Sequence, residues 1–116
     1  MGGHGKTDTT HAWETLMRAA RQVSAEHMTV RLKDFYADWC GPCKTQDPIL
    51  KELEADLNGD VEFEKIDVEA EQEVANEYQV RSLPTLVVEN DDGVVERFIG
   101  VTQRDELETA IEKAGA

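Results

Sequence analysis

Two residues of this chain have the spacing needed for thiol chemistry: Cys40 and Cys43, the only cysteines among its 116 residues. They are separated by Gly41-Pro42, after an apolar stretch that predicts a strand and at the start of a predicted helix. A helix that begins at the first cysteine directs N–H groups and its positive dipole end at that sulfur, which favours the thiolate. Because the thiolate is the species that attacks a disulfide, we expect Cys40 to be the nucleophile and Cys43 the resolving thiol.

The same two cysteines could instead be one half of a zinc site. A structural zinc ion takes four protein ligands, so a second pair of cysteines or histidines must complete the site. The three histidines, His4, His11 and His27, lie singly along the chain with no matching spacing. The sequence therefore favours redox chemistry, and we expect no metal.

The residues around the cysteines match a known pattern. The run Asp34-Phe35-Tyr36-Ala37-Asp38-Trp39-Cys40-Gly41-Pro42-Cys43-Lys44 resembles the active-site signature of the thioredoxin family. Further matches follow in the family's order: Pro48 within a helix, Lys65 before Ile66-Asp67-Val68, the run Ser82-Leu83-Pro84-Thr85, and Gly100 after a hairpin. The resemblance extends from about Met28 to the C-terminus, which makes it far more specific than a Cys-x-x-Cys motif alone.

This resemblance implies an α/β thioredoxin-like fold and a protein-disulfide reductase that acts through a mixed disulfide. It also implies that disulfide-containing proteins are the targets, that a separate thioredoxin reductase restores the dithiol, and that no cofactor binds the chain. An oxidase or isomerase of the same fold is an alternative, which would differ in redox poise. A second alternative is a non-catalytic binding module in which the thiols are incidental.

Asp34 is the next candidate for chemistry. By the two-residue period of a strand it shares a face with Val30, Leu32 and Tyr36, so we expect it to be buried, although a water-facing carboxylate is the plainer alternative. Burial raises the pKa of a carboxyl and lets it exchange a proton near neutral pH. The resemblance implies that Asp34, together with Lys65, helps to deprotonate Cys43; an exposed lysine is the alternative for Lys65.

The resemblance also implies a surface for the target protein. In the family a cis peptide bond precedes the proline that matches Pro84, and the backbone of Leu83 is then free to pair with an extended peptide. Trp39, Gly41, Pro42 and Gly100 would frame a flat, mostly apolar surface around an exposed Cys40 sulfur. For Trp39, packing in the core is the alternative.

Apolar periodicity predicts the elements that hold these residues. Helices are expected at 12–23, from about Cys40 to Leu57, around Val74 and after Thr102, and strands at Thr29–Ala37, Val61–Val68, Thr85–Glu89 and Val94–Ile99. Asn90-Asp91-Asp92-Gly93 is a hairpin signal, and Thr102-x-x-Asp105 resembles a capping box for the last helix. The order predicts a mixed central sheet with helices on both faces.

The start of the chain departs from the family pattern. Residues 1–10 show no hydrophobic period, so we expect them to be disordered, with residues 11–116 forming one thioredoxin-like domain. No stretch before the first helix predicts the N-terminal edge strand usual in thioredoxins. Its absence would expose Val61–Val68, where Glu62 and Glu64 discourage edge pairing.

Charge is the last informative feature. There are 25 Asp and Glu against 12 Lys and Arg, a formal net charge of −13, which argues against nucleic acid or anionic membranes as partners. No apolar run spans a membrane, and we expect no secretory signal at the start of the chain. Two closely spaced cysteines suit a reducing cytosol, so we expect a cytoplasmic protein, and we also expect a monomer. An ordinary acidic protein would explain this charge, and so would adaptation to high salt, where repulsion between carboxylates is screened.

Overall fold

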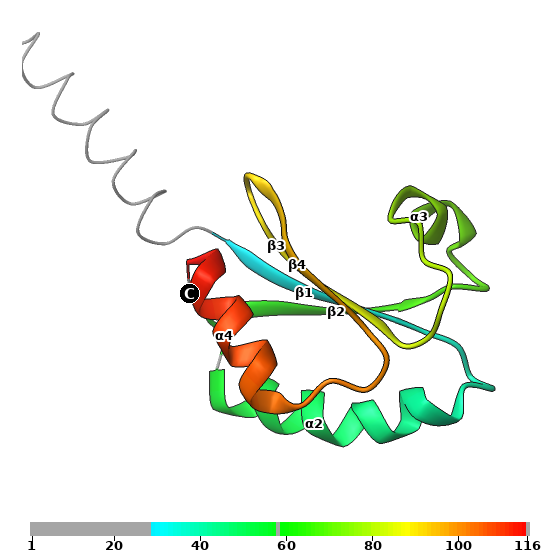
Figure 1. Ribbon diagram of the computed structural model, residues 1–116, viewed down its shortest axis with the longest axis horizontal. Helices are drawn as coiled ribbons and strands as arrows, with labels where there is room; N and C mark the ends of the chain where they lie inside the picture. The colour runs from blue at the N-terminus through cyan, green and yellow to red at the C-terminus, as the bar shows by residue number, and fades with distance from the viewer. Residues whose placement is uncertain (1–28, 58, 116) are drawn as a thin grey trace, which may run out of the picture.

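The computed structural model describes residues 29–57 and 59–115. The elements in chain order are β1 (Val30–Tyr36), α2 (Gly41–Leu57), β2 (Val61–Asp67), α3 (Gln72–Glu77), β3 (Thr85–Asn90), β4 (Gly93–Ile99) and α4 (Arg104–Ala114) (Figure 1). Each predicted element within these residues is present, with ends that differ by a few residues. The predictions for residues 1–28, namely disorder, a helix over 12–23 and a missing edge strand, lie outside the described residues and stay predictions.

The sheet is mixed, as predicted, with the strand order β2-β1-β3-β4. β1 pairs in parallel with β2 and antiparallel with β3, and β3 pairs antiparallel with β4 through the expected hairpin. β1 leads directly into the cysteine pair and is central in the described sheet. Its side chains therefore have strand neighbours on both sides, which restricts the position of Asp34 and of the turn that follows Tyr36.

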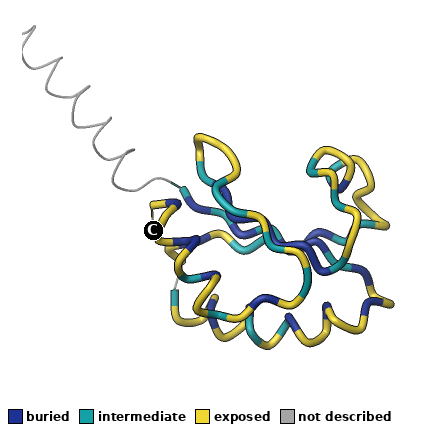
Figure 2. Tube along the Cα trace, viewed as in Figure 1, coloured by how far each residue is buried: buried dark blue, intermediate teal, exposed yellow. Residues whose placement is uncertain are grey.

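Helices cover both faces of the sheet, as predicted. α2 and α4 pack on one face, where a core joins Val30 and Leu32 of β1 to Leu53 of α2 and Leu107 of α4. α3 lies on the opposite face, over a smaller core that contains Phe35 (Figure 1). In Figure 2 the strands between these layers are mostly buried or intermediate, whereas the tip of the β3–β4 hairpin is exposed.

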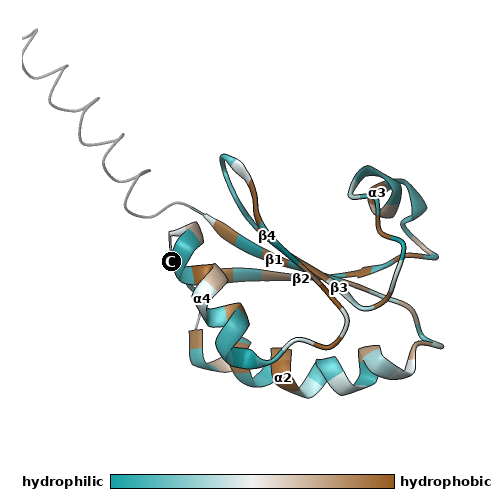
Figure 3. Ribbon diagram, viewed as in Figure 1, coloured by the Kyte–Doolittle hydropathy of each residue, from teal (hydrophilic) through white to brown (hydrophobic). Residues whose placement is uncertain are grey.

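Charge lies mainly on the outer surfaces of this arrangement. Figure 3 shows hydrophilic residues over much of α3 and α4, while the apolar residues of α4 that face the sheet are buried: Leu107, Ala110, Ile111 and Ala114. No helix of the described residues is both long enough and apolar enough to cross a membrane.

One predicted local structure is wrong. Thr102 does not cap the last helix, because α4 begins at Arg104 and its N-cap residue is Gln103, which makes no side-chain capping bond. Thr102 is instead held in the preceding loop, where its hydroxyl donates to the carbonyl of Gly100 at 3.0 Å. Its backbone N–H donates to the buried side chain of Gln46 at 2.7 Å, a tertiary contact that overrides the local capping pattern.

Candidate active site

The cysteine pair lies where β1 ends and α2 begins. A tight turn closes with a hydrogen bond from the Cys40 N–H to the Ala37 carbonyl at 3.1 Å, and α2 starts at the next residue, Gly41. Cys40 and Cys43 form a disulfide with their Cα atoms 5.3 Å apart. The Cys43 N–H, in the first turn of α2, donates to the Cys40 sulfur at 3.2 Å. The predicted aim of helix N–H groups at Cys40 is therefore confirmed.

The expected exposure of Cys40 is wrong for this disulfide form. Cys40 is only 3% exposed and Cys43 only 5%, and both pack in a small cluster with Ala37. The cause is cover from distant segments, since Val68 after β2 and Leu83 before β3 pack against this cluster. The Cys40 sulfur therefore sits at the wall of a groove and does not project from a flat surface.

A groove of about 400 Å³ borders Cys40. Its lining is mostly apolar and comes from three chain segments: Trp39, Cys40, Gly41, Pro42, Val68, Val80, Arg81 and Leu83. The motif residues were predicted, whereas Val68, Val80 and Arg81 were missed. They flank β2 and the proline loop in sequence, and only the packing of these segments beside β1 brings them to the cysteines.

Trp39 is the most exposed large apolar side chain of the described residues, at 68%. Core packing for Trp39 is therefore excluded. Its indole N–H donates to a carboxylate oxygen of Glu69 at 3.0 Å, which holds the ring at one end of the groove. An exposed aromatic ring held by a single hydrogen bond can stack on an incoming apolar segment.

Pro84 and Gly100 lie behind the groove wall. The Leu83-Pro84 peptide bond is cis, as the resemblance implied, and Pro84 itself is buried. The Gly100 N–H donates to the Pro84 carbonyl at 2.8 Å, and Gly100 has a φ of 91°, a backbone conformation that favours glycine. Gly100 thus contacts the proline loop and is not among the residues that line the groove.

Asp34 is buried, as its register predicted, with only 3% of the residue exposed. Within the described part of the chain, no hydrogen-bond donor reaches its Oδ1 atom. Burial raises the pKa of Asp34 from 3.8 to about 6; the Lys65 charge acts to lower this pKa and the Asp47 charge to raise it. Asp34 faces α2 across a cavity of about 90 Å³, which Asp47 and Lys65 also line.

The cavity places Asp34 beside Asp47 of α2, about one helical turn after the resolving thiol. Cys43 and Asp47 are four residues apart, so they lie one above the other on the same face of α2. Asp47 and Asp34 line the same cavity. Asp34 is therefore a buried carboxyl that can exchange a proton near neutral pH, and it lies on the side of α2 on which Cys43 is also buried.

Lys65 lies opposite Asp34 in the β1–β2 register, on the face predicted for it. Its ammonium group nevertheless binds Asp47, with Nζ 2.9 Å from Oδ1, and lies 4.6 Å from the centre of the Tyr36 ring. Partial burial alone would lower the pKa of Lys65, but the hydrogen bond and charge of Asp47 outweigh it and raise that pKa. The side chain is 50% exposed, so the exposed alternative also describes part of its surroundings.

Gln46 is a site residue that the sequence did not single out. Its side chain is fully buried, and its amide N–H donates to the Thr102 carbonyl at 3.0 Å while its oxygen accepts from the Thr102 N–H. This pair of bonds ties the start of α2 to the loop before α4. Gln46 lies between Cys43 and Leu50 on the buried face of α2, and a polar residue in that position was the available signal.

Metal binding finds no support in the described part of the chain. Residues 29–57 and 59–115 contain no group of three or more His, Cys, Asp or Glu side chains that could hold an ion. The three histidines weighed above lie outside these residues.

Known proteins resemble this chain over most of its length. The Thioredoxin family model matches residues 11–113. The thioredoxin of Bacillus subtilis is 43% identical over 84 residues, which is 72% of this chain and 81% of that protein. That of Staphylococcus aureus is 40% identical over 84 residues, with the same two coverages of 72% and 81%.

Two solved structures are also similar. One is a single-site mutant of the thioredoxin from Halobacterium salinarum, with a TM-score of 0.68 and 40% identity, covering 78% of this chain and 79% of that one. The other is oxidized mitochondrial thioredoxin 3 from Saccharomyces cerevisiae, with a TM-score of 0.67 and 33% identity, covering 84% and 89% of the two chains.

Proposed function

The chain belongs to the thioredoxin family, and we propose that Cys40 and Cys43 divide its protein-disulfide reductase activity between an attacking and a resolving thiol. The observation that carries this division is the Cys43 N–H, which points at the Cys40 sulfur from the first turn of α2. A helix N-terminus and its N–H groups stabilise negative charge on that sulfur. Cys43 lies inside the helix and has no such position.

In this reaction two electrons pass from the Cys40–Cys43 dithiol to the disulfide of the target protein. The Cys40 thiolate attacks one sulfur of the target disulfide; a bond forms between them, and the second target sulfur leaves as a thiolate. The Cys43 thiol then loses its proton, and its sulfur attacks Cys40. The mixed disulfide breaks, the target departs fully reduced, and the Cys40–Cys43 disulfide forms, which is the state described here.

Asp34 is the proton acceptor for Cys43 in this scheme. A buried carboxyl with a pKa of about 6 is ionised at neutral pH and is a stronger base than an exposed aspartate. Its Oδ1 atom has no hydrogen-bond donor among the described residues, which leaves it available for a proton. Lys65, opposite Asp34 in register, would offset the negative charge that Asp34 carries between turnovers.

The groove beside Cys40 is the binding surface for the target. Trp39, Gly41 and Pro42 form its wall on the cysteine side, and Leu83 forms the facing wall. The backbone of Leu83 would pair with an extended target segment, because Leu83 lies before the first paired residue of β3, Thr85. Gly100 supports this loop through its bond to the Pro84 carbonyl.

Single-cysteine variants test the two thiol roles. Cys43→Ser retains the nucleophile and lacks the resolving thiol, so target proteins should accumulate as mixed disulfides on Cys40. Cys40→Ser, the matched control, should trap almost none. Non-reducing gels of an insulin-reduction mixture measure both. Equal trapping by the two variants would refute the assigned roles, and no trapping by either would favour a binding module.

The proposal extends to the cellular compartment, the oligomeric state and the partners of the protein. We infer a cytoplasmic monomer that a separate thioredoxin reductase re-reduces, and that has no nucleic-acid or membrane partner. The net charge of −13 supports the exclusion of these polyanionic partners. It also supports adaptation to high salt, as does the 40% identity to a thioredoxin from Halobacterium salinarum.

A chloride series tests the salt adaptation. Screening shortens the range of repulsion from roughly 10 Å at 0.1 M salt to about 3 Å at 1 M. The melting temperature should therefore rise steeply up to about 1 M potassium chloride, with insulin reduction retained beyond it. Sulfate at matched ionic strength separates screening from strengthened apolar burial. A flat melting temperature would rule out the adaptation and leave the reductase assignment intact.

A further inference from the structure

Asp47 is the residue that decides where Lys65 lies. Lys65 is opposite Asp34 in the strand register and could pair with it, yet its Nζ atom is 2.9 Å from Asp47 Oδ1. We propose that Asp47 is a positioning residue, which holds the Lys65 ammonium group away from Asp34 and thereby keeps Asp34 a strong enough base for Cys43. This inference rests on the proton-acceptor role proposed for Asp34.

The first observation is that Asp34 is left without its expected partner. Its Oδ1 atom is buried and receives no hydrogen bond within the described residues, although a lysine stands opposite it on β2. A buried carboxylate normally acquires a donor or a cation, because an unpaired one costs several kcal/mol. Here the cation pairs with the carboxylate of Asp47 on α2.

The second observation is that the three groups share one cavity. Asp34, Asp47 and Lys65 all line a space of about 90 Å³ between β1, β2 and α2. That volume is large enough for water. A proton that Asp34 has taken from Cys43 can therefore leave through this cavity, past the Asp47–Lys65 pair at its rim.

Three other charged side chains line the cavity that Asp34 faces. From α2, Lys51 and Glu54 also line the cavity, and from β2 so does Glu64, which is paired with Lys33 at 2.7 Å. On the other side, β3 places the uncharged Leu86 opposite Asp34. Among these charged groups, Lys65 and Asp47 are the two whose charges act on the pKa of Asp34, and they act in opposite directions.

The sign of the effect follows from both groups. The negative charge of Asp47 raises the pKa of Asp34 directly, and its bond to Lys65 weakens the opposing influence of that lysine. Loss of the Asp47 charge therefore lowers the pKa of Asp34 in two ways. An Asp34 with a lower pKa is a weaker base, and it accepts the Cys43 proton less readily.

Asp47→Asn tests the proposal in the oxidised full-length chain. The Asp34 carboxyl, labelled with ¹³C, is titrated by NMR in the wild type and the variant. We expect the Asp34 midpoint to fall by about half a pH unit, the size appropriate to partly exposed charges. Glu54→Gln is the matched control, since it removes a carboxylate of the same helix and cavity, and it should shift the midpoint far less.

A second background separates positioning from direct repulsion. In Lys65→Met, where no ammonium group can move, Asp47→Asn should shift the Asp34 midpoint by less than half as much as in the wild type. Asp47→Glu should restore the wild-type midpoint. An unchanged or raised midpoint in Asp47→Asn, or an equal shift in Glu54→Gln, overturns the proposal. An equal shift in the Lys65→Met background overturns the positioning by Lys65.

The same variants connect the titration to the reaction. The pH dependence of mixed-disulfide resolution should move to lower pH in Asp47→Asn, in parallel with the Asp34 midpoint. The titration itself needs no turnover. A failure of this inference therefore appears in the NMR data, whereas a failure of the proposed thiol roles appears in the trapping experiment.

Discussion

Two carboxyl groups of this protein are both buried, yet their pKa values are shifted in opposite directions. Asp34 is 3% exposed and Glu89 is 8% exposed, and they lie on the neighbouring strands β1 and β3. Asp34 faces α2, whereas Glu89 faces the side of the sheet that carries α3. Burial raises the pKa of Asp34 to about 6, while the pKa of Glu89 is lowered.

The partners of Glu89 account for the difference. Burial alone would raise its pKa, but it accepts hydrogen bonds from the Tyr78 hydroxyl at 2.5 Å and from Arg31 Nε at 2.9 Å. The ammonium group of Lys33 lies 3.7 Å away. Asp34 has no such set, since the one cation opposite it is bound to Asp47. Burial acts to raise both pKa values; at Glu89 the hydrogen bonds and nearby cations outweigh it, and at Asp34 it prevails.

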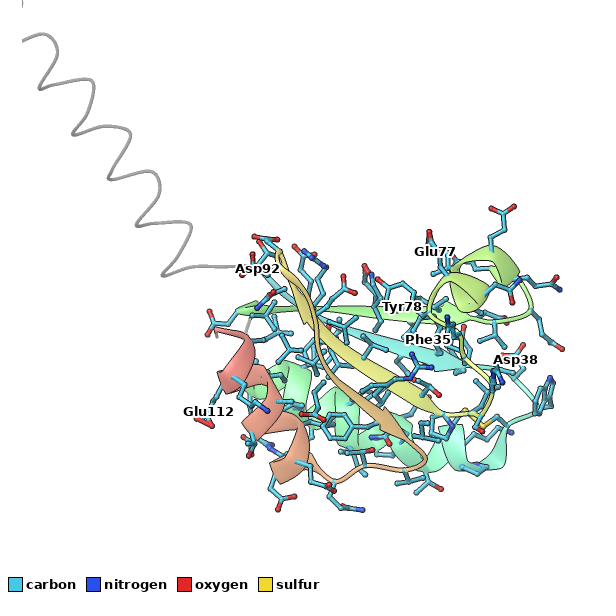
Figure 4. The ribbon with its side chains drawn as sticks, turned by 45° about the horizontal axis from the view of Figure 1, so that its top comes forward. Phe35, Asp38, Glu77, Tyr78, Asp92 and Glu112 are labelled. Atoms are coloured by element: carbon cyan, nitrogen blue, oxygen red, sulfur yellow. A yellow bond between two sulfur atoms is a disulfide. The ribbon has the colours of Figure 1, made fainter. Side chains whose placement is uncertain are left out.

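The two buried carboxyls therefore have different roles: Glu89 stabilises the fold, whereas Asp34 can take part in proton transfer. Glu89 joins β1, β3 and the residue that follows α3 in one network, so its charge holds elements together. Figure 4 shows Tyr78 beside Phe35 on this face, and their ring centres are 5.4 Å apart. Asp34 joins nothing within the described residues through Oδ1, so its charge costs stability and remains available for proton transfer.

Asp34→Asn should give the largest change in the free energy of unfolding, because it removes the buried carboxylate whose Oδ1 atom has no donor within the described residues. The folded-state pKa of about 6 lies above the ordinary 3.8, so wild-type stability falls as pH rises through this window. The two pKa values differ by about two units, so ionised Asp34 costs about 3 kcal/mol above pH 7. The variant should be more stable than wild type by up to that amount, with slower turnover.

Urea unfolding at pH 7.5 and at pH 4 measures this gain. Most of the difference should vanish at pH 4, because the carboxyl is then protonated in the folded protein, and pH 4 lies close to its ordinary pKa of 3.8 in the unfolded chain. A gain of equal size at both pH values would show that the ionised carboxyl is not its origin.

Glu89→Gln should have the opposite sign and a smaller size. It removes a charge that accepts bonds from Tyr78 and Arg31, so we expect a loss of about 2 kcal/mol at pH 7. Because the folded-state pKa is lowered, this contribution is present above about pH 4.5 and disappears as pH falls through the folded value. The variant should therefore approach wild-type stability in acid, as measured by the same unfolding series.

Glu64→Gln is the control for this variant. Glu64 pairs with Lys33 at 2.7 Å, but its side chain is 38% exposed, so its loss should cost at most about 0.5 kcal/mol. A penalty for Glu64→Gln as large as that for Glu89→Gln would mean that the network, and not the burial of its central carboxylate, carries the stability.

The local sequence pattern was sufficient to predict the burial of Asp34, but not the burial and ion pairing of Glu89. Asp34 alternates with Val30 and Leu32 along a single strand, and a period of two is enough to place it among apolar neighbours. Glu89 appears in the sequence as the polar end of the run Thr85–Glu89. Its partner Arg31 is 58 residues away, and only the antiparallel register of β1 with β3 places the two opposite each other.

The same distinction applies to the candidate site. The two cysteines, the start of α2 and the cis bond before Pro84 follow from local motifs or from the family resemblance. The burial of Cys40, the bonds between Gln46 and Thr102, and the pairing of Lys65 with Asp47 arise between segments far apart in sequence. No local pattern contains these contacts, and the capping box expected at Thr102 fails for the same reason.

Apart from the Glu64→Gln control, Tyr78→Phe should give the smallest change in the free energy of unfolding, and it tests the comparison most directly. The variant keeps the ring against Phe35 and under the Lys33 ammonium group, 5.8 Å from the ring centre, and removes only the bond to Glu89. Burial, followed by the Glu89 contact, raises the pKa of Tyr78 to about 12, so the hydroxyl remains a donor across the working pH range. One bond to a carboxylate that keeps Arg31 should contribute about 1 kcal/mol.

The pKa of Glu89 should also rise in Tyr78→Phe, because a donor to its charged form is lost. This moves Glu89 one step towards the condition of Asp34, a buried carboxyl without donors. In the double variant with Glu89→Gln the penalties should be less than additive, since both remove the same bond. Fully additive penalties, or an unchanged Glu89 titration, would mean that Tyr78 stabilises the fold through its ring alone. The opposite titration of the two carboxyls would then rest on Arg31 and Lys33, the cations of β1, and not on a shared network with the α3 side.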